Sequence, residues 1–201
     1  MEFGNSVIPI LKSAIRNPKS AMSNVLLLSG SPAKQSRSNT ILEYVIKRLN
    51  AEGIETTLLG LRDFPAEDLI FAKYDSPAFE PFKASLNAAS AVVIATPIYK
   101  ASLTGGLKAL LDVLPQQSFR KKSVLPIATG GTASHLLAID FAIKPILATL
   151  GASDIQQGVF IVDSQFTYTD DGGFTLEAEL QERLDAGISQ LAESVKQHIA
   201  R

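Results

Sequence analysis

Residues 25–40 read VLLLSGSPAKQSRSNT, an apolar run that is followed by a polar loop and then by the start of an amphipathic helix. The apolar run at residues 25–28 is typical of a strand that is covered on both faces of a sheet. After the loop, apolar residues recur at helical spacing, at Ile41, Leu42, Val45, Ile46 and Leu49. A strand, a loop and a helix in this order form the first half of a βαβ unit.

The same alternation of apolar runs and helix-period segments continues along the chain and predicts a parallel sheet. Five runs are expected to form its strands, at residues 25–28, 56–59, 91–95, 124–128 and 155–162. Besides the helix that follows the first loop, helices are expected at residues 78–88, 103–114, 134–150 and 176–199. We therefore predict an α/β three-layer sandwich with a five-stranded parallel sheet.

Two prolines disfavour the strand and the helix in which they are expected to lie. Pro126 falls inside the fourth apolar run, where a central strand would lose one hydrogen bond of its ladder. Pro145 lies inside the helix expected at residues 134–150 and should kink or divide it, at a local cost of roughly 3 kcal/mol if nothing compensates. The segment 62–80, with two further prolines, is expected to be a long surface connection.

The composition excludes several classes of function. The chain has 201 residues, of which 46% are hydrophobic, enough for one sizeable core but too few for two ordinary domains. A formal net charge of −1 gives no basic footprint, so we expect neither nucleic acid nor a membrane as a partner. The chain has no cysteine, which excludes disulfides, thiolate metal sites and the cysteine-dependent phosphatases that carry a phosphate loop after their first strand.

The first residues differ in character from the rest. Residues 1–21 fit no secretory signal, and an organellar transit peptide stays open as an alternative. Because Met22 stands directly before the first strand, we expect it to be the native start, residues 1–21 to be a poorly ordered extension, and residues 22–201 to form one domain. The absence of export signals and of cysteine favours the cytoplasm.

The loop at residues 29–39 has the composition of a phosphate cradle. Gly30 permits a sharp turn off the strand, and hydroxyls, Arg37 and the free N–H groups of the following helix would direct donors at one place. A simpler interpretation is an ordinary turn with Ser38 or Thr40 as the helix cap and Glu43 closing a capping box.

Two more polar loops follow apolar runs directly, at residues 96–100 and 129–132. In the first, Pro97 stiffens the backbone and Tyr99 offers a flat face to a planar ring. In the second, Gly130 and Gly131 let the backbone approach a ligand and present N–H donors. Each loop alone also fits an ordinary strand exit. Ligands bind beyond the carboxyl ends of parallel strands, so the three loops together describe a site for flavin mononucleotide (FMN).

The sequence resembles the NADPH-dependent FMN reductases. The resemblance is carried by GSP at residues 30–32, SRS at 36–38, ATPIYK at 95–100, GLK at 106–108, LLD at 110–112 and LPIATGG at 125–131. It includes HLLA at 135–138 and GVF at 158–160 and extends from about residue 24 to the C-terminus. Within the family, the chain looks most like the reductases that serve alkanesulfonate monooxygenases in two-component systems.

The resemblance implies a flavodoxin-like sheet of strand order 2-1-3-4-5 and assigns roles to residues. It places the FMN phosphate against Ser31, Ser36, Arg37, Ser38 and Asn39. It places the isoalloxazine ring along Pro97, Ile98 and Tyr99, and the polar edge of the ring against Thr129, Gly130 and Gly131.

The implied reaction needs no catalytic side chain, because a hydride passes directly from the nicotinamide of NADPH to the flavin. Backbone donors around Gly130 and Gly131 would stabilise the negative charge on the reduced ring. The expected partners are FMN, NADPH and a flavin-dependent monooxygenase. Two alternatives stay open: a reductase that retains FMN and reduces quinones or azo compounds, and a flavodoxin-like electron carrier.

The resemblance also implies a homo-oligomer, a tetramer in the sulfonate-linked reductases. Those proteins often carry an inserted aromatic residue, typically Tyr, that makes a π-bulge at a subunit interface; here Phe141 stands in that helix. His135 is adjacent to Ser134 on one helix and no nucleophile elbow is present, which argues against a hydrolase. No pair of His and carboxylate has ligand spacing, so no metal is expected.

Overall fold

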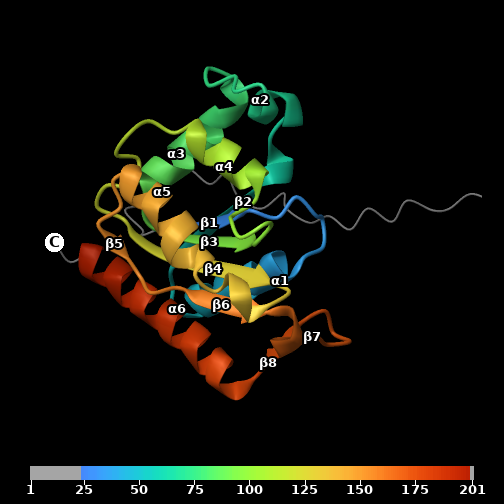
Figure 1. Ribbon diagram of the computed structural model, residues 1–201. Helices are drawn as coiled ribbons and strands as arrows, with labels where there is room; N and C mark the ends of the chain where they lie inside the picture. Colours follow the sequence, from blue (N-terminus) through green and yellow to red (C-terminus); the bar gives the residue numbers. More distant parts are fainter. Residues whose placement is uncertain (1–23, 200–201) are drawn as a thin grey trace, which may run out of the picture.

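The structure, a computed structural model, describes residues 24–199 (Figure 1). At its centre lies a parallel sheet of order β2-β1-β3-β4-β5, with β6 also paired to β4. The strands of the sheet are β1 (Asn24–Ser29), β2 (Glu55–Gly60), β3 (Ala89–Pro97), β4 (Ser123–Gly130), β5 (Asp154–Ile155) and β6 (Val159–Val162). This order is that of the flavodoxin-like folds and confirms the predicted α/β sandwich.

Helices cover both faces of the sheet in two layers (Figure 1). One face is covered by α1 (Arg37–Ala51) and α6 (Ala178–Ile199). The other is covered by α2 (Ala66–Ile70), α3 (Glu80–Ala88), α4 (Gly105–Asp112) and α5 (Lys144–Thr149). Each layer buries its own apolar cluster against the sheet, which explains why the central strands read as near-continuous apolar runs. Within residues 24–199, none of the helices combines the length and the apolar character that crossing a membrane requires.

The fifth predicted strand is divided into β5 and β6, and Pro126 gives the reason. In β4 the carbonyl of Val124 accepts a hydrogen bond from the amide of Gln156 at 2.9 Å, so Pro126, two residues on, faces the same side. Opposite Pro126 the outer strand is interrupted, because β5 pairs only up to Val124 and β6 starts at Ile127 of β4. The missing N–H of the proline therefore faces a break in the ladder and no hydrogen bond is lost.

The helix expected at residues 134–150 is irregular. It consists of a 3-10 turn (Ala133–His135), a π-helical turn (Ile139–Ile143) and α5. Pro145 is the second residue of α5 and lies directly after the π-helical turn, at the place where the helix changes from π-helical to α-helical form. The backbone stays helical from Ile139 through Thr149, so Pro145 does not divide the helix, and the predicted kink stays a prediction. Phe141 lies within the π-helical turn.

Three further features differ from the sequence prediction. The helix cap of α1 is Ser36, whose Oγ accepts from the amide of Asn39 at 3.2 Å, so the simpler interpretation with Ser38 or Thr40 as cap was wrong. The segment 62–80 contains the short helix α2. An antiparallel hairpin of β7 (Phe166–Tyr168) and β8 (Phe174–Leu176) precedes α6, where a helix was expected from residue 176. The expectation for residues 1–21 lies outside the described residues.

Candidate functional site

The loops that follow β1, β3 and β4 meet at the carboxyl edge of the sheet and surround a cavity of about 300 Å³. Ten of the eleven residues assigned to FMN from the sequence line it: Ser31, Ser36, Arg37, Ser38, Pro97, Ile98, Tyr99, Thr129, Gly130 and Gly131. The arrangement follows from the topology, because the carboxyl ends of parallel neighbouring strands lie at one edge.

Asn39 is the one assigned residue that does not line the cavity, and its side chain instead supports the first loop through hydrogen bonds. Its Nδ2 donates to the carbonyl of Lys34 at 3.1 Å and to that of Ala33 at 3.4 Å. Its Oδ1 accepts from the hydroxyl of Ser29 at the end of β1. Asn39 therefore shapes the loop that lines the cavity without lining the cavity itself.

Gly30 is required for packing rather than for a turn. It has no positive φ, and a Cβ built on it would lie 2.7 Å from both Thr96 Oγ1 and Leu107 Cδ2. Its amide donates to the carbonyl of Ala95 at 2.8 Å, and its carbonyl accepts from the hydroxyl of Thr104 at 2.6 Å. The expectation that Gly30 provides a sharp turn is corrected: the glycine allows the first loop to lie directly against β3 and α4.

The three loops are joined to one another by hydrogen bonds. The amide of Ile98 donates to the carbonyl of Thr129 at 2.8 Å, which ties the second loop to the third. The hydroxyls of Ser38 and Thr129 lie 3.4 Å apart, which ties the first loop to the third. Both Ser38 and Thr129 are buried, so these contacts are shielded from water.

Tyr99 lies at the rim of the cavity with 51% of its surface exposed. It opens a tight turn in which its amide donates to the carbonyl of Ser102 at 2.9 Å. The two central residues of the turn, Lys100 and Ala101, have φ values of 51° and 63°, a left-handed conformation that is uncommon for residues other than glycine. The turn projects Tyr99 as an open platform.

The two glycines of the third loop have different roles. A Cβ on Gly130 would lie 3.0 Å from Phe160 Cζ, so Gly130 permits close packing of β4 on β6. A Cβ on Gly131 would meet nothing closer than Asp163 Oδ2 at 4.0 Å, so the backbone of Gly131 borders open space. Gly131 is the position at which a ligand could approach the main chain.

Arg37 is the cation of the cavity. Its Nη1 lies 3.3 Å from Asp163 Oδ2, and its guanidinium lies over the ring of Phe166 at 5.8 Å from the ring centroid. Its Nε is buried and has no hydrogen-bond partner among the described residues. A buried N–H without an acceptor costs free energy.

Four cavity residues were not predicted: Ala33, Gln35, Asp163 and Tyr168. The first two belong to the first loop. Asp163 directly follows β6, and its position after a strand of the same parallel sheet was the pattern that could have identified it. Tyr168 lies on the β7–β8 hairpin, for which the sequence offered no recognised pattern.

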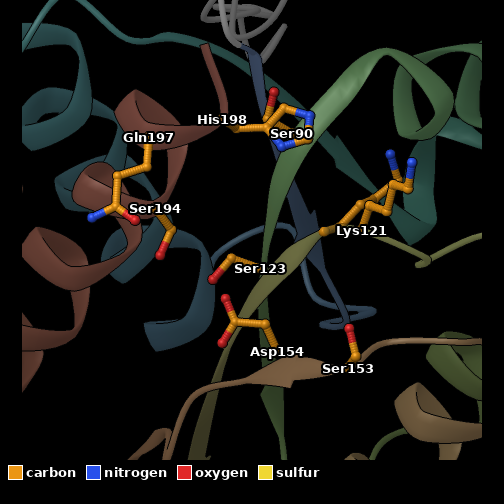
Figure 2. A pocket seen from close by; sticks show the side chains of 9 residues that line it. Ser90, Lys121, Ser123, Ser153, Asp154, Ser194, Gln197 and His198 are labelled. Atoms are coloured by element: carbon orange, nitrogen blue, oxygen red, sulfur yellow. The ribbon is translucent and has the colours of Figure 1, made fainter. Parts of the chain in front are cut away.

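A larger hollow of about 490 Å³ lies at the opposite end of the sheet, near the amino ends of β4 and β5 (Figure 2). Its labelled lining includes Ser90, Ser123 and His198. Lys122, which also lines it, donates from Nζ to the carbonyl of Ala89 at 2.6 Å, and burial lowers the pKa of this ammonium. Ligands of open α/β sheets bind at the carboxyl edge, so the smaller cavity is the candidate site.

The carboxyl-edge cavity fits an FMN-like ligand in its chemistry. One end combines hydroxyls, the N-terminus of the 15-residue helix α1 and the guanidinium of Arg37, a donor set suited to a phosphate. The other end combines the platform of Tyr99 with the open backbone of Gly131, a set suited to the face and polar edge of a ring.

Comparisons with known proteins show the family to which the chain belongs. A family model described as NADPH-dependent FMN reductase matches residues 23–167. "FMN reductase (NADPH)" of Escherichia coli K12 is 46% identical over 82% of this chain and 85% of its own, and the protein of the same name from Pseudomonas putida KT2440 is 41% identical over 88% of each. The crystal structure of an apo NADH:FMN oxidoreductase has a TM-score of 0.77 at 29% identity, covering 86% of this chain and 90% of that one. The chain therefore belongs to the NADPH-dependent FMN reductases, oxidoreductases that use FMN and NADPH.

Proposed function

We propose that residues 22–201 form one reductase domain that binds FMN as a diffusible substrate in the carboxyl-edge cavity and passes the reduced flavin to a partner monooxygenase of organosulfur metabolism. The observation that carries the binding site is the convergence of ten of the eleven assigned residues, Arg37 among them, on one cavity.

At the phosphate end, Ser31, Ser36 and Ser38 supply hydroxyls and Arg37 supplies the charge. The first free amides of α1 add donors, and the positive end of the helix dipole favours an anion there. Asn39 keeps the loop in shape through its bonds to Ala33 and Lys34. These groups fix the ligand at one end without taking part in the reaction.

At the ring end, Pro97, Ile98 and Tyr99 line one side of the cavity, and the amides around Gly130 and Gly131 would hold the polar edge of the ring. When bound, FMN accepts a hydride from NADPH. Backbone donors at the polar edge would stabilise the negative charge that follows, as in an oxyanion hole. No side chain is required to move a proton at this site.

The open rim supports FMN as a substrate rather than a permanent group. Tyr99 and Tyr168, which line the cavity, are both about half exposed. A ligand held between such residues keeps contact with water and can leave without local unfolding. The link to a monooxygenase and to sulfonate chemistry rests on the sequence resemblance described above.

We also propose that the π-helical turn Ile139–Ile143 lies at a subunit interface of a homo-tetramer. Phe141 is 78% exposed, and Leu136 and Leu137 beside it are 48% and 58% exposed. Clustered exposed apolar side chains of this size mark an interaction surface more often than a free one.

The first experiment is NADPH oxidation by protein purified free of flavin, followed by absorbance with and without added FMN. Oxidation that appears only with FMN and rises with its concentration is the expected result. Oxidation that ignores added FMN and needs a quinone or dye would favour a reductase with retained FMN. If the protein oxidises no NADPH under any condition, the result would favour the flavodoxin-like electron carrier.

A further inference from the structure

Asp163 brings a negative charge into a cavity proposed to bind an anion. It follows β6 directly, and its Oδ2 lies 3.3 Å from Arg37 Nη1. The same oxygen lies 4.0 Å from the position that a Cβ on Gly131 would occupy. The carboxylate therefore lies between the cation of the first loop and the open backbone of the third.

Arg37 is the only cationic side chain among the described residues that line the cavity, and Asp163 is their only carboxylate. The lining as a whole therefore carries no net side-chain charge. A site built solely to hold a phosphate tightly would present cations without a competing acid. The pairing of one cation with one acid calls for another explanation.

Asp163 is not needed to hold the guanidinium in place. The guanidinium also lies over the ring of Phe166, and Phe166 stacks on Phe174 at 4.9 Å between ring centroids. The carboxylate approaches a single nitrogen of Arg37, Nη1, and leaves Nε unpartnered. With side chains 36% and 40% exposed, the pair is open to water, and exposed pairs of this kind contribute little to stability.

We propose that Asp163 is an affinity-setting residue: it competes with the FMN phosphate for Arg37 and so keeps the flavin releasable. This inference rests on the proposed function, because it assumes that the phosphate reaches Arg37. When the dianion arrives, the carboxylate stays beside it in the same cavity, and two anions then share one cation. Repulsion between them weakens binding of FMN but not of riboflavin, which has no phosphate.

The test is the dissociation constant of each flavin, measured by quenching of flavin fluorescence with protein free of bound flavin. Asp163→Asn removes the charge and keeps the shape. We expect FMN to bind about tenfold more tightly to this variant, a change of ~1.4 kcal/mol, and riboflavin to bind as it does to the unmodified protein. Added salt should weaken FMN binding more steeply in the variant, because its site carries a net positive charge.

Glu193→Gln is the matched control, since it removes one negative charge from an exposed position on α6 outside the cavity. It should change neither affinity. Asp163→Ser provides a second variant, and thermal melting establishes that each protein is folded. If either folded variant binds FMN as weakly as the unmodified protein, or more weakly, Asp163 is a support for Arg37 and the proposal is wrong.

Arg37→Met separates failure of this inference from failure of the proposed site. The variant should lose the preference for FMN over riboflavin. If it keeps that preference in full, the phosphate does not bind at Arg37 and the proposed site is wrong, whatever Asp163 does. If the preference disappears in Arg37→Met but Asp163→Asn gives no tighter binding, the site stands and only the competition fails.

Discussion

Pro126 and Gly158 face each other across the break in the outer strand: a Cβ built on Gly158 would lie 2.8 Å from the carbonyl oxygen of Pro126. Gly158 has a φ of 87°, a conformation that L side chains rarely adopt. The proline removes a ladder donor from β4, and the glycine lets the chain pass close to it and rejoin the sheet as β6. Together, Pro126 and Gly158 allow the outer strand to be interrupted and then to resume at the edge of the sheet.

We expect Gly158→Ala to destabilise the protein by about 2–4 kcal/mol, because backbone strain adds to a clash with β4. Gly53→Ala is the control, since Gly53 has a φ of 76° but nothing within 4 Å of its Cβ position. It should cost only about 1 kcal/mol. Urea unfolding measures both, and equal losses would contradict a role for the close approach to Pro126.

Gly30→Ala should destabilise the protein by about 1–3 kcal/mol and displace the first loop, because the new methyl would overlap Thr96 and Leu107. Gly105→Ala, at the first position of α4 with open space around it, should be neutral or stabilising by up to about 1 kcal/mol. Urea unfolding of the two variants gives the change in the free energy of unfolding for each. Comparable losses would mean that the packing at Gly30 is not what requires a glycine.

Asn39→Ala should weaken FMN binding by about tenfold and leave riboflavin binding within about twofold, because Asn39 shapes only the loop at the phosphate end. Asn87→Ala, an exposed position on α3, is the control. Fluorescence titration with each flavin gives both constants. An equal loss for the two flavins would show that Asn39 supports the whole cavity rather than the first loop.

Tyr44→Phe tests the polar cluster that joins α1 to α6. The Tyr44 hydroxyl donates to Asp185 at 2.6 Å and accepts from Arg48 at 2.8 Å and from Gln181 at 3.0 Å. We expect a loss of about 1–2 kcal/mol in the free energy of unfolding at neutral pH. Tyr74→Phe, at an exposed tyrosine, should be neutral.

We also expect the stability difference between the unmodified protein and Tyr44→Phe to depend on pH. Burial, and then the hydrogen bond to Asp185, raise the pKa of Tyr44 above its usual value of 10.0. The fold thus favours the neutral phenol, so its contribution is fully present below pH 10 and is lost as pH rises through the raised pKa. The difference in stability between the unmodified protein and Tyr44→Phe should therefore shrink above pH 10. A constant difference would argue against this assignment.

Phe141→Asp should dissociate the assembly that we propose, because the charge would be buried in an apolar contact. Light scattering at equal protein concentration should give a smaller native mass for this variant than for the unmodified protein. Phe71→Asp changes an aromatic residue that is 70% exposed on the α2 side and should leave the mass unchanged. An unaltered mass for Phe141→Asp would place the interface elsewhere.

The sequence was sufficient for those features that depend on local pattern. Apolar runs marked the central strands, and strand exits marked the loops, since both follow from burial and from parallel topology. The break between β5 and β6 could not be predicted from the sequence. The composition of the run at residues 155–162 does not show that Pro126 of β4 lies opposite it. The assignment of Asn39 to the phosphate stays a prediction. The sequence did not show that its amide also supports the first loop, because that role depends on tertiary hydrogen bonds.

The hydrogen bond from the amide of Ile98 to the carbonyl of Thr129 joins main chain to main chain. It therefore uses no side-chain donor or acceptor of either loop. Substitutions at the exposed rim, at Tyr99 or Tyr168, can alter ligand choice while the frame beneath them keeps its shape. A scaffold of this kind separates evolutionary change in specificity from the requirement to fold, and it offers protein engineers a few rim positions at which new acceptors can be selected.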